Sequence, residues 1–270
     1  MRKSFNNSQP IGVFDSGVGG LSILIELRRL LPEENFIFLA DQKYVPYGEK
    51  TKKELVQRGL RITNYFVKNH NIKMMVIACN TATCGAINEI RNRYAFPIVG
   101  TVPAIKPAAE TTKTGVIGVM STPSTSKSEV VRNLIRDNCK GVKVFNVGCK
   151  NLEDTVEQGE MGNSEVDKLL KKYLREIKAS KADRLVLGCT HYPFLKKVIA
   201  KMAGPNLKLI DSGKAIAKRT NALLVRNKFK NNQDKKGSLS FVTTGDPEKF
   251  RRVASKLLKI KVEAGQALIP

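Results

Sequence analysis

The chain has 270 residues, of which 41% are hydrophobic, and carries a formal net charge of +23 from 47 Lys and Arg against 24 Asp and Glu. This length and apolar content exclude a largely disordered protein and suffice for one large folded domain or two small ones. No apolar run approaches the roughly 18 residues that span a bilayer, and the start MRKSFNNSQP has no apolar stretch like that of a secretory signal, so we expect a cytoplasmic protein with no membrane segment.

Short β-branched apolar runs alternate with longer amphipathic segments along the whole chain. In chain order, the runs that predict strands are IGVFD (11–15), NFIFLA (35–40), MMVIA (74–78), TGVIGV (114–119), VKVFNV (142–147), RLVLG (184–188), LKLID (207–211) and SLSFVT (238–243). This alternation is typical of βαβ units, and the fully apolar runs indicate strands that helices cover on both faces. We therefore expect an α/β fold with mainly parallel sheets.

Local signals mark the beginnings of several helices. Thr51-x-x-Glu54 and Ser126-x-x-Glu129 have the form of a capping box, in which two side chains satisfy backbone groups at a helix start. Asp246 before Pro247 predicts another helix start, since proline fits the first helical position.

Two similar segments, VIACNTAT (76–83) and VLGCTHYP (186–193), each place a cysteine where a predicted strand ends and a helix begins. Such a pair could form a disulfide, bind a metal, fill a core or make two halves of one active site. Five cysteines in a cytoplasmic chain argue against a disulfide framework, and the absence of a C-x-x-C pair with only two histidines argues against a zinc site. We expect no metal.

The matched positions of Cys79 and Cys189 favour the active-site alternative. Moving a proton from one face of a carbon to the other requires an acid and a base on opposite sides, and a thiol with a pKa near 8.5 can serve as either. A helix N-terminus favours the thiolate. The other three cysteines, Cys84, Cys139 and Cys149, are expected to be ordinary buried residues.

Other polar residues lie at the same predicted strand ends. Asp15 precedes the glycine-rich turn GVGG and could either cap a helix or assist a thiol. His191 could orient the neighbouring Cys189. Tyr47 and Gly48 lie in a turn after the strand end LAD, where ligand contacts gather, although the turn alone does not indicate a site.

Five motifs together resemble the glutamate racemases of bacterial cell-wall synthesis, a family of amino-acid racemases that need no cofactor. They are FDSGVGG (14–20), ADxxxxPYG (40–48), ACNTAT (78–83), VPAIKPA (102–108) and GCTHYP (188–193). The resemblance implies interconversion of L- and D-glutamate by proton transfer at the α-carbon, with Cys79 and Cys189 as the two acid–base groups and D-glutamate supplied for peptidoglycan synthesis.

The resemblance also assigns further site residues. Asp15 and His191 would assist the thiols, and the residues that would contact substrate are Asp15, Ser16, Tyr47, Gly48, Asn80, Thr81, Thr190 and His191. The segment GCKNLEDTVEQG (148–159) departs from the family pattern, with lysine in place of a proline. Aligning its ends makes Glu157 the assisting glutamate, with Glu153 as the rival candidate.

The resemblance further implies two similar α/β domains with the active site in the cleft between them. We expect residues 1–99 with 211–270 to form the first domain, and 100–210 the second. A homodimer is also possible. The excess of Lys and Arg predicts a non-specific attraction to nucleic acids. The alternatives are a related aspartate or hydantoin racemase, or a basic nucleic-acid-binding protein with the same fold.

Overall fold

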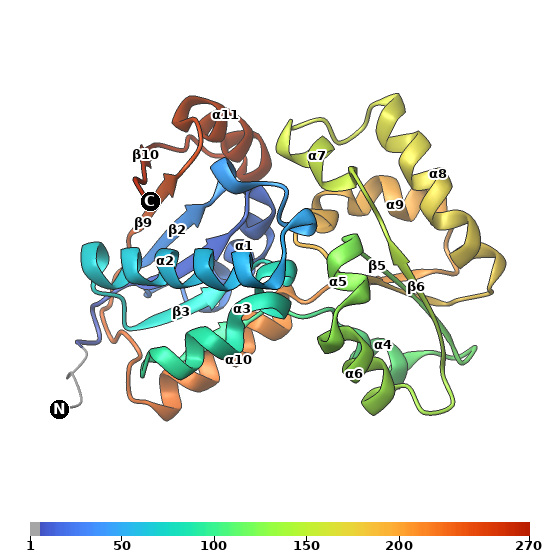
Figure 1. Ribbon diagram of the computed structural model, residues 1–270, viewed down its shortest axis with the longest axis horizontal. Coiled ribbons are helices and arrows are strands. Elements are labelled where there is room, and N and C mark those ends of the chain that lie inside the picture. Colours follow the sequence, from blue (N-terminus) through green and yellow to red (C-terminus); the bar gives the residue numbers. More distant parts are fainter. Residues whose placement is uncertain (1–5) are drawn as a thin grey trace. The chain divides into compact units, whose positions relative to one another are not determined.

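The computed structural model describes residues 6–270. The chain divides into two compact units (Figure 1). Unit 1 contains the described part of Met1–Thr101 together with Gly213–Pro270, and unit 2 contains Val102–Ser212. The chain thus leaves unit 1 after Thr101 and returns to it at Gly213, so unit 1 is completed by the C-terminal segment.

Unit 1 is built on a parallel sheet of six strands. They are β1 (Ile11–Asp15), β2 (Phe36–Ala40), β3 (Met74–Ile77), β4 (Ile98–Gly100), β9 (Leu239–Thr243) and β10 (Ala264–Gln266). Their order is β10-β9-β2-β1-β3-β4, and every neighbouring pair is parallel. The central strands β1, β2 and β3 are buried at every position, because helices cover both faces of the sheet.

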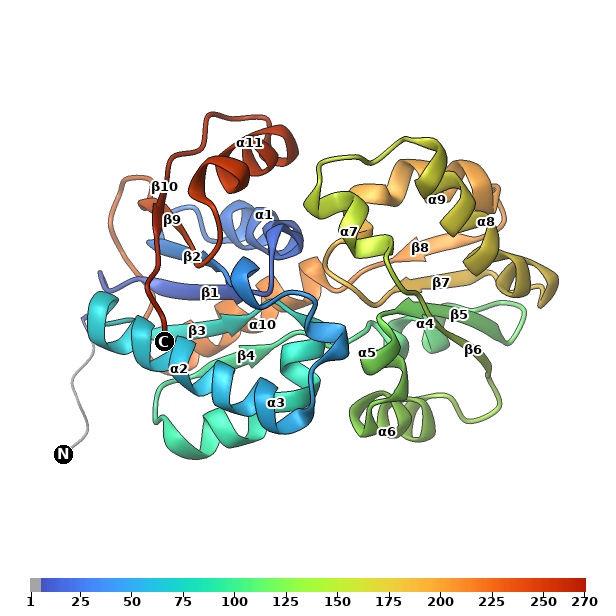
Figure 2. The same cartoon turned by 45° about the horizontal axis from the view of Figure 1, so that its top comes forward.

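Helices form the two covering layers, whose arrangement can be followed in Figure 2. One face carries α2 (Lys52–His70) and α3 (Asn80–Arg93), which pack against each other. The other face carries α1 (Leu21–Leu30), α10 (Gly213–Arg226) and α11 (Pro247–Leu258). Of these, α1 contacts both α10 and α11. The close fit is visible at Gly12, where an added Cβ would lie 3.0 Å from the ring of Phe66 on α2.

Unit 2 repeats this architecture with four parallel strands. They are β5 (Val116–Ser121), β6 (Lys143–Gly148), β7 (Arg184–Leu187) and β8 (Lys208–Ile210), in the order β6-β5-β7-β8. Its helices are α4 (Ile105–Thr111), α5 (Pro123–Lys127), α6 (Glu129–Asn138), α7 (Leu152–Glu157), α8 (Ser164–Ala179) and α9 (Lys196–Ala203). The two parallel sheets confirm the expected α/β class.

All eight predicted strands occur, whereas β4 and β10 were not predicted. Each has only three residues, and β10 is a largely exposed edge strand with the sequence AGQ. Such short runs carry too few apolar residues to be distinguished from a loop.

Of the three predicted helix starts, those at Thr51 and Asp246 are confirmed and the one at Ser126 is wrong. The capping box of Thr51 and Glu54 is present with both of its hydrogen bonds, and Asp246 caps α11. The prediction for Ser126 is wrong, because α6 begins later and is capped by Ser128, whose side chain accepts from the backbone of Val131. Between residues 6 and 270, no helix is both long and apolar enough to cross a membrane.

A buried ion pair joins the amino-terminal ends of two strands in unit 1. Lys73, directly before β3, contacts Glu34, two residues before β2, with 2.6 Å between Nζ and Oε2. Both side chains are almost fully buried. Glu34 also accepts a hydrogen bond from the backbone of Asn231, and Lys73 donates to the carbonyl oxygen of Asn7. The pair therefore anchors Asn7 and Asn231, which lie in irregular segments, near the amino-terminal ends of β2 and β3.

Replacing Lys73 by Gln should leave the carboxylate of Glu34 buried without its counter-ion. We expect the free energy of unfolding to fall by about 3–5 kcal/mol, because breaking one side of a buried pair leaves an uncompensated charge. Urea denaturation of the purified protein measures this change. The double variant K73Q/E34Q, which removes both charges, should recover part of the loss; a K73Q variant as stable as the wild type would contradict the role of the pair.

Candidate active site

In unit 1 the polar residues predicted for the site lie at the carboxyl-terminal ends of the central strands. Asp15 is the last residue of β1 and is fully buried, and its Oδ2 accepts a hydrogen bond of 2.6 Å from the backbone of Gly20. A Cβ on Gly20 would lie 2.5 Å from the Cβ of Asp15. The turn can therefore close over this carboxylate only with glycine at position 20.

Cys79 follows β3 and is the N-cap residue of α3. Its Sγ accepts a hydrogen bond of 3.4 Å from the backbone N–H of Ala82, and the hydroxyl of Ser16 lies 3.6 Å from the same sulfur. The side chain is 5% exposed. The sulfur thus lies at a helix N-terminus, where negative charge is favoured, and beside the loop that follows Asp15.

The next two residues, Asn80 and Thr81, form the first turn of α3 and are also buried. The side-chain Nδ2 of Asn80 has no hydrogen-bond partner within the described part of the chain. A buried amide donor costs free energy when it is unpaired, so this group suits a ligand that brings an acceptor.

Tyr47 and Gly48 lie in a short 3₁₀ segment, η3 (Tyr47–Glu49), after β2. Tyr47 is 4% exposed, and its hydroxyl donates a hydrogen bond of 2.5 Å to Asp41. Burial, together with the nearby Asp41 carboxylate, raises the pKa of Tyr47 well above its usual value. Tyr47 belongs to the same apolar cluster as Cys79.

In unit 2, Cys189 lies two residues beyond β7 and forms a chain of contacts with two other predicted residues. The Sγ of Cys189 is 3.5 Å from Nδ1 of His191, and Nε2 of His191 is 2.7 Å from Oε1 of Glu157, the last residue of α7. Cys189 and His191 are 7% and 4% exposed. Thr190 lies between them and is equally buried.

The electrostatics of this chain of contacts are set by burial and by the pairing of charges. Burial raises the pKa of Cys189, and His191 partly offsets that effect. For His191, burial alone would lower the pKa, but Cys189 and the Glu157 carboxylate raise it well above the usual value. The arrangement therefore favours a charged imidazolium between two acidic groups, and it can transfer a proton to or from the sulfur.

Glu153, the rival candidate, lies one turn before Glu157 on α7. Burial raises the pKa values of Cys149 and Cys189, and the charge of Glu153 adds to both shifts. The geometry thus brings Glu157 into contact with His191 and leaves Glu153 as a nearby charge that acts on the thiols.

Some residues near the predicted site lay outside the sequence-based candidates. Asp41 and Arg58 form a buried ion pair next to Tyr47, and Tyr192, which is completely buried, follows His191. Asp41 could have been found, since it is a carboxylate at a predicted strand end. Arg58 could not, because it lies within a helix and carries no motif.

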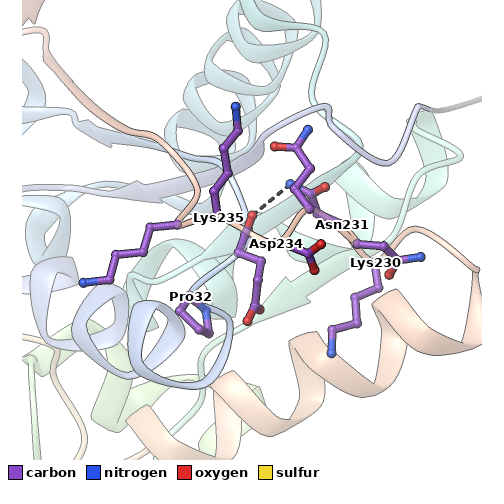
Figure 3. Close-up of a pocket in the computed structure, with 9 residues that line it drawn as sticks. Pro32, Lys230, Asn231, Asp234 and Lys235 are labelled. Atoms are coloured by element: carbon purple, nitrogen blue, oxygen red, sulfur yellow. Dashed lines mark hydrogen bonds between the residues drawn. The ribbon is translucent and has the colours of Figure 1, made fainter.

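One cavity of about 570 Å³ lies away from all the predicted residues. It is lined by Pro32, Glu33 and the segment from Lys230 to Lys236, near the amino-terminal end of β2. The amines of Lys230 and Lys235 point in opposite directions (Figure 3). These groups do not converge on a common ligand. The described residues, 6–270, also contain no group of three or more His, Cys, Asp or Glu that could hold a metal ion.

Comparison with known proteins places the chain in a family. The family model of the Asp/Glu/Hydantoin racemases matches residues 19–220. A glutamate racemase from Herpetosiphon aurantiacus is 43% identical over 245 residues, which cover 91% of this chain and 96% of the relative.

Solved structures agree with that match. Glutamate racemase isoform RacE1 from Bacillus anthracis superposes with a TM-score of 0.88 at 29% identity, covering 98% of this chain and 99% of the other. The Escherichia coli glutamate racemase, solved with L-glutamate and the activator UDP-MurNAc-Ala, has a TM-score of 0.85 at 32% identity, covering 97% and 98%. The chain therefore belongs to the Asp/Glu/Hydantoin racemase family and is, by class, a racemase.

Proposed function

We propose that this protein is a glutamate racemase that interconverts L- and D-glutamate with Cys79 and Cys189 as its two acid–base groups. The observation that carries the proposal is that each unit holds one buried cysteine at the end of a central strand, next to groups that stabilise its charge. The relatives named above support glutamate as the substrate.

The two thiols would approach the α-carbon of the bound amino acid from opposite sides. In one direction a thiolate removes the α-proton while the other thiol delivers a proton to the opposite face, and the roles exchange in the reverse direction. On the Cys189 side, the imidazolium of His191 stabilises the thiolate and Glu157 holds the imidazolium. On the Cys79 side, the N-terminus of α3 and the Ser16 hydroxyl lie at the sulfur.

The remaining predicted residues supply contacts for a charged amino acid. The amide of Asn80, the hydroxyls of Ser16, Thr81 and Thr190, and the backbone around Gly48 suit two carboxylates, while Asp15 suits the ammonium group. Fixed dipoles of this kind lower the free energy of the negative charge that develops at the α-carbon.

Further parts of the proposal concern the cellular context. D-glutamate produced in this way would supply peptidoglycan synthesis, a role that complementation of a D-glutamate-requiring bacterium tests. The net charge of +23 favours the approach of an anionic substrate. The expected homodimer and the attraction to nucleic acids stay predictions.

Serine in place of either cysteine should reduce racemisation in both directions by about 10²–10⁴-fold, because a hydroxyl is a far weaker acid than a thiol. Chiral chromatography after incubation with L- or D-glutamate, without added cofactor, measures the rates. Cys84→Ser is the matched control, since Cys84 lies in the same helix as the Cys79 cap and is only partly buried. Full activity in C79S or C189S would contradict the mechanism, and faster inversion of L-aspartate than of L-glutamate would contradict the substrate assignment.

Replacing Glu157 by Gln should shift the pH dependence of the reaction. The Glu157 carboxylate favours protonated His191 and raises its pKa, so the neutral amide lowers that pKa and the imidazolium is lost at a lower pH. We expect the alkaline limb of the kcat/KM profile to move to lower pH by about one unit. Glu153→Gln is the matched comparison on the same helix; if that variant moves the limb and E157Q does not, Glu153 is the assisting glutamate.

A further inference from the structure

Asp41, at the end of β2, is the centre of a buried hydrogen-bond network in unit 1. The side chain is completely buried. Its two oxygens accept hydrogen bonds from Nε of Arg58 (2.8 Å) and from Nη2 of the same guanidinium (2.6 Å). Thr244 Oγ1 donates a further bond of 2.8 Å, and the Tyr47 hydroxyl one of 2.5 Å. The carboxylate thus fixes the Tyr47 side chain directly.

Arg58, on α2, also contacts groups from other parts of the chain. The guanidinium carbon lies 4.0 Å from the centre of the Tyr44 ring, and Nη1 donates to the backbone carbonyls of Ile269 (3.2 Å) and Pro270 (3.0 Å). Only 2% of the residue is exposed. One side chain therefore joins helix α2, the loop after β2 and the last residues of the chain.

The position of Tyr47 explains why this network bears on the proposed substrate site. Its hydroxyl hydrogen is already donated to Asp41, and its ring packs in the cluster that contains Phe14 and Cys79. The Tyr47 hydroxyl therefore has no hydrogen left to donate to a substrate, which could instead contact the ring, the hydroxyl oxygen as an acceptor, and the backbone of Tyr47 and Gly48. Where those groups lie depends on where the hydroxyl is anchored.

We propose that Arg58 is a positioning residue for racemisation, which holds the loop of residues 46–48 in its substrate-binding conformation through Asp41 and the Tyr47 hydroxyl. This inference rests on the proposed function, in which Tyr47 and Gly48 contact glutamate. Arg58 is linked to the Tyr47 hydroxyl through the Asp41 carboxylate. Its effect is exerted through the loop.

The planar guanidinium is essential to this role. It gives two parallel hydrogen bonds to the Asp41 carboxylate and still has Nη1 for the carbonyls of Ile269 and Pro270. Lysine keeps the positive charge, but its ammonium cannot reproduce the paired geometry or the stacking on Tyr44. The charge of Asp41 would then still be paired with a positive charge. The orientation of its carboxylate, and therefore that of the Tyr47 side chain, would become less defined.

The test compares Arg58→Lys and Tyr47→Phe with the wild type. For R58K we expect kcat/KM for glutamate to fall by about 10- to 100-fold, mainly through a higher KM, because the loop contacts are displaced from their productive geometry. Y47F removes only the hydroxyl and should raise KM in the same direction by a smaller factor. Backbone hydrogen exchange over residues 43–50 should become faster in both variants.

Lys73→Arg is the matched control. Lys73 and Glu34 form the other strongly buried ion pair described above for unit 1, at the amino-terminal ends of the strands and outside the network around Asp41. The substitution keeps the charge and disturbs the pair, as R58K does, so it reports the effect of instability alone. We expect K73R to lower the melting temperature while KM and the exchange of residues 43–50 stay at the wild-type values.

The outcomes separate this inference from the proposed function. If R58K and Y47F keep the wild-type KM and loop exchange, or if K73R changes both as much as R58K does, Arg58 does not position the loop. If the wild type does not interconvert glutamate, the proposed function fails instead. Hydrogen exchange then still decides whether Arg58 orders residues 43–50, since that measurement needs no substrate.

Discussion

The candidate site depends on one constraint, which is that all strands of a parallel sheet have their carboxyl-terminal ends on the same side. Parallel strands all end on the same side, so residues that directly follow neighbouring strands are brought together whatever their separation in the chain. In unit 1 the register pairs Asp15 with Ala40 and Phe14 with Ile77, which sets Asp15, Asp41 and Cys79 along one edge. In unit 2, Met120 of β5 pairs with Leu187 of β7, so Cys189 lies at the carboxyl-terminal end of that sheet.

The two thiols have different chemical surroundings. Cys79 has backbone N–H and hydroxyl neighbours at a helix start, whereas Cys189 has a histidine that is itself paired with a carboxylate. Burial opposes both the thiolate of Cys189 and the imidazolium of His191. His191 offsets part of the rise in the pKa of Cys189, whereas Cys189 and Glu157 together raise the pKa of His191 well above its usual value. In the proposed mechanism, the chemistry of Cys189 would therefore be sensitive to Glu157, and that of Cys79 would depend on the backbone of α3.

Much of this arrangement could be predicted from the sequence because it follows from local patterns. The apolar runs before Asp15, Cys79 and Cys189 identify central strands, and the position after such a run identifies the functional edge. Contacts between distant segments could not be predicted in this way. Glu157 was proposed only through a resemblance, and the bond between Arg58 and Asp41 depends on how α2 packs, which no local motif encodes. The cap of α6 was misassigned because Ser126 and Ser128 both have suitable side chains, and Ser126 lies within the preceding helix α5, which the sequence did not predict.

The central claim is that one sulfur atom removes the proton from the α-carbon and a different sulfur atom delivers a proton to its opposite face. It is tested most directly by starting the reaction with L-glutamate in deuterated water and following the isotope at the α-carbon in the first few per cent of conversion. The account predicts that the D-glutamate formed carries deuterium at this position, since its proton comes from a thiol that has exchanged with solvent, while the remaining L-glutamate keeps its hydrogen. Early D-glutamate that retains the original hydrogen would mean that a single group carries the proton across, and would contradict the account.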